Sequence, residues 1–239
     1  MKVLVLYVFH QYHDRVKHFI ERAIFEDESI DFLMICNSKT CPDLVVPSYV
    51  KTMFRDNLGY DFGGWSDGLL TDDLYKKYDQ FIFVNSSVMG PYLPKEYTGK
   101  WTDLYLQGLR DNVKLFGSTI NTIENPLQLS HVQSYIFAMD KTTLEYLIDC
   151  EIFSATQYAA TFLEAVWKKE VYMSRKIIEH GWNIGSLFEY YKDVDFTFKT
   201  KHHTHYPFTF LGDIMYPPYR GKLWDEHQLV FIKGNRVPL

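Results

Sequence analysis

The run from Arg55 to Trp65 concentrates residue types that could bind a charged ligand. It reads Arg-Asp-Asn-Leu-Gly-Tyr-Asp-Phe-Gly-Gly-Trp and follows an apolar segment at 50–54. An arginine can fork onto a diphosphate, an aspartate can accept hydrogen bonds from ribose or sugar hydroxyls, and glycines let backbone approach a ligand closely. The alternative is a glycine-rich turn in which Arg55 pairs with Asp56 or Asp67. We assign ligand binding to Arg55, Asn57, Gly59, Asp61, Gly63 and Gly64.

A second candidate is the triplet Asn85-Ser86-Ser87, which ends the fourth apolar segment. Its amide and hydroxyl groups could bind the same ligand. Asn85 and Ser87 are weak candidates for holding Mn²⁺ or Mg²⁺, because hard cations prefer charged oxygen ligands. The alternative is a turn that only ends the strand. His203 and His205, in a histidine cluster near the end of the chain, could add metal ligands, contact a diphosphate or be solvated.

Two further groups could act on a second substrate. His131, Gln133 and Ser134 precede an apolar segment and could line an acceptor pocket, or could be ordinary loop residues. Glu170 lies in a helical pattern and could be a general base that deprotonates an acceptor hydroxyl. Asp61 is the other carboxylate proposed for that role. The alternative for Glu170 is a solvated partner of a nearby lysine or arginine.

The elements that must position these residues follow from hydrophobic periodicity. Strands are predicted at 2–9, 30–36, 50–54 and 80–84, with helices at 14–25 and 65–75. This alternation predicts a mostly parallel α/β sheet, in which ligands lie at the carboxyl ends of the strands. Further predicted elements are strands at 113–120, 133–139 and 182–188 and helices at 101–110, 142–150 and 158–180.

Composition narrows the function classes. The length of 239 residues suits one large domain, and a net charge of −5 without a basic stripe argues against a nucleic-acid partner. Cys36, Cys41 and Cys150 have no CxxC spacing, which favours a reducing compartment. No apolar run is long enough for a transmembrane segment, so we expect a cytoplasmic protein. Walker A, GxSxG, GxGxxG and HExxH motifs are absent from the sequence.

Four stretches together resemble the rhamnan synthesis F family (RgpF-like), within the GT-A class of glycosyltransferases. They occur in the family's order and span most of the chain. They are the run 55–65; the turn 85–91; Phe116-Gly117-Ser118-Thr119 leading to His131-Val132-Gln133-Ser134; and the helix that carries Glu170 and Ser174 and ends at Gly181.

The resemblance implies a GT-A-like fold, with a Rossmann-like, mostly parallel sheet flanked by helices in a single domain, 1–239. Residues 1–100 would form the nucleotide-sugar-binding half, and 101–239 the acceptor-binding half and C-terminal tail. His10 and Asn37, at the ends of the first two strands, would lie near the base and ribose. Family members commonly have Asn-Asp-Ser where this chain has Ser86, a departure that weakens the expectation of a metal.

The resemblance also implies an activity. It is the transfer of a sugar, often rhamnose, from a nucleoside-diphosphate sugar to a polysaccharide or glycan acceptor, with inversion. A non-catalytic sugar- or nucleotide-binding module of the same fold is the main alternative. A nucleotidylyltransferase is a weaker one, because the sequence has no Lys- or Arg-rich loop to hold a triphosphate.

Overall fold

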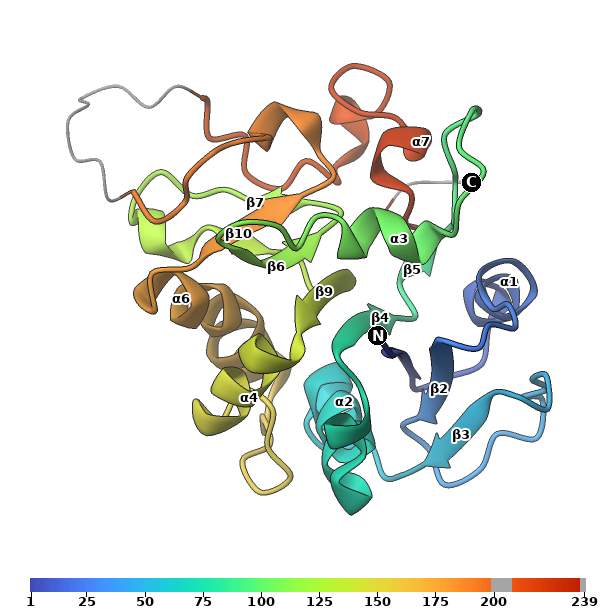
Figure 1. The fold of residues 1–239 in the computed structure, drawn as a ribbon. Coiled ribbons are helices and arrows are strands. Elements are labelled where there is room, and N and C mark those ends of the chain that lie inside the picture. The colour runs from blue at the N-terminus through green and yellow to red at the C-terminus, as the bar shows by residue number, and fades with distance from the viewer. Residues whose placement is uncertain (199–207, 237–239) are drawn as a thin grey trace.

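The core of the protein is a seven-stranded sheet with the order β10-β6-β9-β4-β1-β2-β3 (Figure 1). The computed structural model describes residues 1–198 and 208–236. Within those residues β9 is the one antiparallel strand of this sheet, pairing with β4 on one side and β6 on the other. The strands are β1 Val3–Phe9, β2 Ile30–Cys36, β3 Lys51–Phe54, β4 Gln80–Asn85, β6 Val113–Gly117, β9 Ile136–Asp140 and β10 Asn183–Ser186.

Two small antiparallel pairs stand outside this sheet. They are β5 Val88–Met89 with β11 Ile232–Lys233, and β7 Ile120–Asn121 with β8 His131–Val132. The helices are α1 Asp14–Ala23, α2 Tyr60–Leu70, α3 Trp101–Leu106, α4 Lys141–Asp149, α5 Phe162–Glu164, α6 Tyr172–Glu179 and α7 Glu226–Leu229. The 3₁₀ turns are η1 Thr71–Lys77, η2 Leu127–Leu129, η4 Glu189–Tyr191 and η5 Pro217–Tyr219, and η3 Ala165–Val171 is π-helical.

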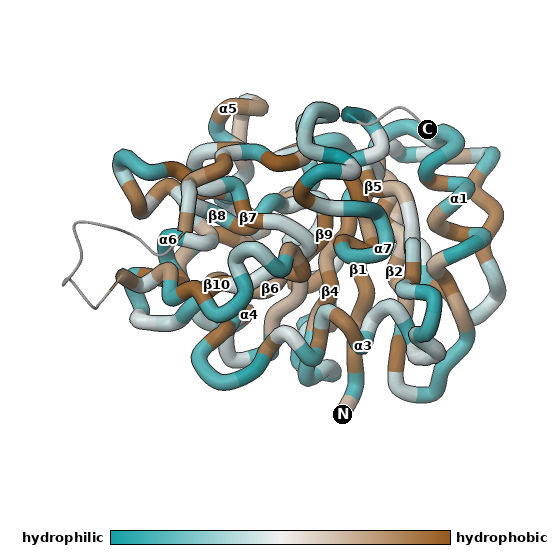
Figure 2. Tube along the Cα trace, turned by 90° about the horizontal axis from the view of Figure 1, so that it is seen from above, coloured by the Kyte–Doolittle hydropathy of each residue, from teal (hydrophilic) through white to brown (hydrophobic). Residues whose placement is uncertain are grey.

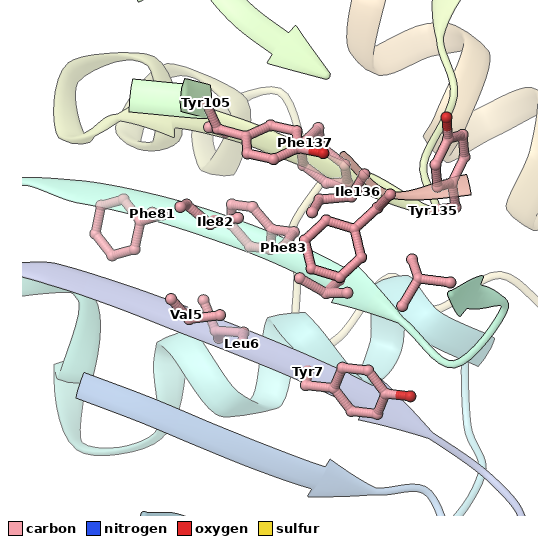
Figure 3. Close-up of a cluster of buried hydrophobic side chains, with 14 of the residues drawn as sticks. Val5, Leu6, Tyr7, Phe81, Ile82, Phe83, Tyr105, Tyr135, Ile136 and Phe137 are labelled. Carbon is pink, nitrogen blue, oxygen red and sulfur yellow. The ribbon is translucent and has the colours of Figure 1, made fainter. Parts of the chain in front are cut away.

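The sheet forms because its central strands are apolar on both faces. Every residue of β1 is buried, and Figure 2 shows hydrophobic colour on the central strands beneath a more hydrophilic periphery. On one face Trp65 of α2 packs edge-on against Phe83 and Phe137. On the other face Tyr7 stacks on Phe19 of α1, at 4.2 Å between ring centroids. Figure 3 shows part of this core, including Tyr7, Phe83 and Phe137.

The expected fold class is confirmed, since the sheet is mostly parallel, Rossmann-like and flanked by helices within one GT-A-like domain. Strands from before and after residue 100 belong to this one sheet. The assignment of nucleotide-sugar binding to residues 1–100 and of acceptor binding to residues 101–239 stays a prediction. None of the helices in the described ranges is long and apolar enough to cross a lipid bilayer.

The largest differences from the predicted elements concern two helices. The helix predicted at 65–75 begins at Tyr60, so Gly63 and Gly64 of the 55–65 run lie inside α2 and Gly59 is its N-cap. The helix predicted at 158–180 begins at Phe162 and contains the π-helical turn η3 before α6. Both differences alter where the candidate residues lie. Asp140 caps the N-terminus of α4, because its side chain accepts a hydrogen bond from the Thr143 N–H.

Candidate active site

A cavity of about 370 Å³ lies at the carboxyl edge of the sheet, where ligands of parallel α/β proteins bind. In Figure 2 this edge, with β5 and α5, lies at the opposite end of the strands from the N-terminus. Segments far apart in the sequence contribute to the lining, which comprises Tyr60, Asp61, Phe62, Asn85, Ser86, Ser87, Ser134, Tyr135, Phe162, Ala165, Val166, Glu170, Lys233, Asn235 and Arg236. The structure therefore brings together Asp61, the 85–87 triplet, Ser134 and Glu170.

Asp61 reaches the cavity because the chain reverses just before α2. Gly59 and Tyr60 both have left-handed backbone, with φ of 73° and 57°. A side chain at Gly59 would be strained by that backbone and would contact the Tyr158 ring at 2.8 Å. The turn ends with Asp61 in the first turn of α2, the end of a helix that favours negative charge.

Arg55 holds this turn in place. Its side chain is 7% exposed, and its Nε donates to Asp67 Oδ2 at 2.6 Å. The guanidinium also donates to Asn37 Oδ1 at 2.7 Å and to the Leu58 carbonyl at 2.8 Å. Arg55 does not line the cavity. The structure thus contains the alternative expected for Arg55, a pairing with Asp67, and a contact of its guanidinium with the ligand stays a prediction.

The glycines of α2 approach protein atoms closely. A Cβ at Gly63 would lie 1.9 Å from the Leu58 carbonyl oxygen, and one at Gly64 would lie 2.6 Å from a methyl group of Val8. The Gly63 N–H donates to the Gly59 carbonyl and is not free for a ligand. Helix packing therefore accounts for Gly63 and Gly64, and their contact with a donor stays a prediction.

Asn85 joins the triplet to Asp61. Its amide donates to Asp61 Oδ2 at 3.0 Å, and its Oδ1 accepts from the Ser87 N–H at 3.0 Å and the Ser87 hydroxyl at 2.5 Å. These bonds of Asn85 with Ser87 form the strand-ending turn that was the alternative to a metal site at the triplet. Burial raises the pKa of Asp61 to about 6; the hydrogen bond from Asn85 opposes the rise, and the charge of Glu170 adds to it.

The triplet does not fit a divalent metal as it stands, because Oδ1 of Asn85 and the Ser87 hydroxyl bind each other. In the described part of the chain, no group of three or more His, Cys, Asp or Glu side chains is arranged to hold a metal ion. The other two expected ligands, His203 and His205, lie outside the described residues. A role for Mn²⁺ or Mg²⁺ therefore has no support from these side chains.

Glu170 enters the cavity from the π-helical turn η3, a kind of irregularity that is frequent at functional sites. Its Oε1 accepts a hydrogen bond of 2.7 Å from the Ser134 N–H. This bond ties Glu170 to the segment before β9 and orients its carboxylate. The geometry differs from the solvated helix position that was the alternative for Glu170.

Besides Arg55 and the three glycines of the 55–65 run, five more of the expected residues lie outside the cavity lining. His131 and Gln133 are buried and bond the Leu129 carbonyl and the Thr119 hydroxyl, respectively. Asn37 is buried, where it bonds Arg55 and the Tyr60 carbonyl. His10 and Asn57 are exposed, and His10 bonds the Asn37 carbonyl. Their contacts with a donor or acceptor stay predictions.

The sequence analysis missed Tyr135, Phe162, Lys233, Asn235 and Arg236, which all line the cavity. One available signal was the apolar stretch at 229–232, which ends in Lys-Gly-Asn-Arg. A larger cavity, of about 590 Å³, lies along β6 and β10, but none of the expected site residues lines it. We therefore place the candidate active site in the smaller cavity.

The sequence matches one protein family, and solved structures are similar to the fold. The family described as rhamnan synthesis protein F matches residues 32–228. No curated protein matches the sequence. One similar solved structure is CMP:2-keto-3-deoxy-manno-octonic acid synthetase complexed with CTP, at 12% identity, with a TM-score of 0.43 over 77% of this chain and 88% of that one. Another is the A197 protein from STIV, at 9% identity, with a TM-score of 0.34 over 61% of this chain and 68% of that one.

Proposed function

Because the chain belongs to the rhamnan synthesis protein F family, we propose that it is a glycosyltransferase of polysaccharide biosynthesis. It transfers a sugar, with rhamnose as the first candidate, from a nucleoside-diphosphate sugar to a polysaccharide or glycan acceptor, with inversion. The observation that supports this most is the placement of two carboxylates, Asp61 and Glu170, in one cavity at the carboxyl edge of the sheet. Such a cavity has room for a sugar beside a proton acceptor.

We assign the general base to Asp61. The acceptor oxygen forms a bond to the anomeric carbon, the bond from that carbon to the diphosphate breaks, and the acceptor proton passes to the carboxylate. With its pKa at about 6, Asp61 is mainly ionised at neutral pH yet basic enough to take a proton. Oδ2 is held by Asn85, and no donor among the described residues bonds Oδ1. Glu170, fixed by Ser134, orients the acceptor hydroxyl.

The rim of the cavity supports an acceptor made of sugars. Phe162 lines the cavity and is 66% exposed, and Tyr60 also lines it. Tyr60 meets Phe162 edge-on with ring centroids 6.2 Å apart. Exposed rings beside a polar cavity suit the apolar faces of sugar units, because such faces bury area without losing their hydroxyl hydrogen bonds.

A panel of nucleoside-diphosphate sugars tests this function. We expect pure protein to release the nucleoside diphosphate from one donor, faster when a glycan acceptor is present, and Asp61→Asn to abolish release. Tight donor binding without release by the wild-type protein would instead favour the non-catalytic module. The mutual bonding of Asn85 and Ser87, which leaves no built metal site at the triplet, is the observation that favours this second candidate.

A cytoplasmic location belongs to the same proposal. Cys36, Cys41 and Cys150 are all free thiols, as a reducing compartment would keep them. Nucleoside-diphosphate sugars would have to be available in that compartment. Fractionation of cells that express the tagged protein tests the location.

A further inference from the structure

Lys233 brings a cation from near the end of the chain to the triplet turn. It is the last residue of β11 and lies opposite Val88 in the antiparallel pair that β11 forms with β5. The next N–H, of Gly234, donates to the Ser87 carbonyl at 2.8 Å. The β11 strand is therefore bonded directly to the turn formed by Asn85, Ser86 and Ser87.

The ammonium group of Lys233 is unpaired in the described structure. Among residues 1–198 and 208–236, no acceptor lies within hydrogen-bonding distance and no carboxylate within ion-pairing distance; its neighbour is the Tyr135 ring, with Nζ 5.5 Å from the centroid. Burial lowers the pKa of Lys233, and the charge of Glu170 opposes that change. A partly buried cation without a hydrogen-bond partner is unfavourable, and an anion that entered the cavity would offset that cost.

The two arginines near the cavity already bind protein oxygen atoms. Arg236 lines the cavity, but its guanidinium pairs with Asp213. Arg15 donates from Nε to the Ser86 carbonyl at 3.0 Å and does not line the cavity. In the described part of the chain, Lys233 is thus the cation lining this cavity that forms no ion pair with a carboxylate.

We propose that Lys233 binds the diphosphate of the sugar donor in the place of a divalent metal ion. This inference rests on the proposed function. When the bond from the anomeric carbon to the β-phosphate oxygen breaks, the electron pair stays on that oxygen, and the ammonium group stabilises the new charge. Ser86, which lines the cavity, leaves room for the diphosphate without adding a competing carboxylate.

Calorimetry with nucleotides tests the inference without turnover. The probes are UDP, GDP and dTDP, each compared with its monophosphate, in EDTA. We expect one diphosphate to bind the wild-type protein at least about tenfold more tightly than its monophosphate. Lys233→Met, which keeps the length and the apolar stem, should reduce that ratio to about one. Lys233→Arg should keep most of it, and Lys222→Met, an exposed lysine of the same C-terminal region, should leave it unchanged.

The outcomes separate this inference from the proposed function. Wild-type protein that binds the diphosphate only after Mn²⁺ or Mg²⁺ is added, or Lys233→Met protein that keeps the ratio, overturns the inference and leaves the glycosyltransferase proposal standing. Binding of no nucleotide under either condition overturns both. If Lys233→Met does not fold, Lys233→Gln and the comparison of EDTA with Mn²⁺ on wild-type protein decide the question.

Discussion

The side-chain amide of Asn85 donates a hydrogen bond of 3.0 Å to Oδ2 of Asp61. Because Asn85 ends β4 and Asp61 lies in the first turn of α2, this bond joins two elements at the carboxyl edge of the sheet. It holds a carboxylate whose pKa burial has raised to about 6. The protein thus tolerates an unfavourable charge at the position where we place the base, as active sites often do.

Asp61→Asn is expected to stabilise the fold at neutral pH while it removes activity. A rise in pKa from 3.8 to about 6 means that the native state holds its proton more tightly than the unfolded state does. The associated stability is present below pH 4 and is lost as pH rises to about 6, for a cost of up to about 3 kcal/mol above that. Asparagine carries no charge and can still accept from Asn85. Urea unfolding at pH 8 should therefore show a gain of about 1–3 kcal/mol, which vanishes near pH 4; an equal gain at both pH values would contradict this account.

The pH dependence of transfer should follow the same group. If Asp61 takes the acceptor proton, kcat/KM falls about tenfold per pH unit as pH drops below about 6, because the carboxylate is then protonated. Initial rates from pH 4.5 to 8.5 at saturating donor measure this limb. Glu170→Gln should lower the rate but keep the limb, since Glu170 orients the acceptor. A limb that disappears in Glu170→Gln would transfer the base role to Glu170.

Arg55→Ala should act on stability more than on the ligand. The change removes hydrogen bonds to Asp67, Asn37 and Leu58 from a nearly buried guanidinium, and we expect a loss of about 3 kcal/mol in the free energy of unfolding. Lys51→Ala, which breaks the more exposed pair with Asp31, should cost less than about 1 kcal/mol. Urea denaturation measures both. Unchanged stability with weakened nucleoside-diphosphate binding would restore the ligand contact that the sequence analysis expected for Arg55.

The sheet could be predicted closely because its central strands are apolar on both faces. The bounds of β2 agree with the predicted 30–36, and β1 begins one residue later than predicted. The start of α2 was placed five residues too late, because Gly63 and Gly64 are typical of loops. The two glycines lower the intrinsic stability of the helix. They also let the helix approach Leu58 and Val8 closely, and only the tertiary structure reveals these contacts.

The part of the candidate site that follows the strands could also be predicted from the sequence. Asp61, Asn85 and Ser87 follow predicted strands, and the carboxyl ends of parallel strands meet at one edge. Lys233 has no such signal, because β11 has two residues and pairs with β5, far away in the sequence. A strand that short carries no periodicity, so its partner could not be inferred. The π-helical turn η3, which carries Glu170, could not be inferred either, because it interrupts an otherwise ordinary helical pattern over a short stretch.

Phe162 provides a test of the acceptor side of the cavity. Its ring lines the cavity and is 66% exposed, so Phe162→Ala removes a stacking surface without opening the core. We expect a loss of about tenfold in kcat/KM for a long glycan acceptor, expressed mainly in KM, and an unchanged Kd for the nucleoside diphosphate. Tyr190→Ala, another exposed aromatic that does not line the cavity, is the matched control. Equal effects of the two changes would show that the exposed ring of α5 has no part in binding the acceptor, and the acceptor would then have to approach from another side of Glu170.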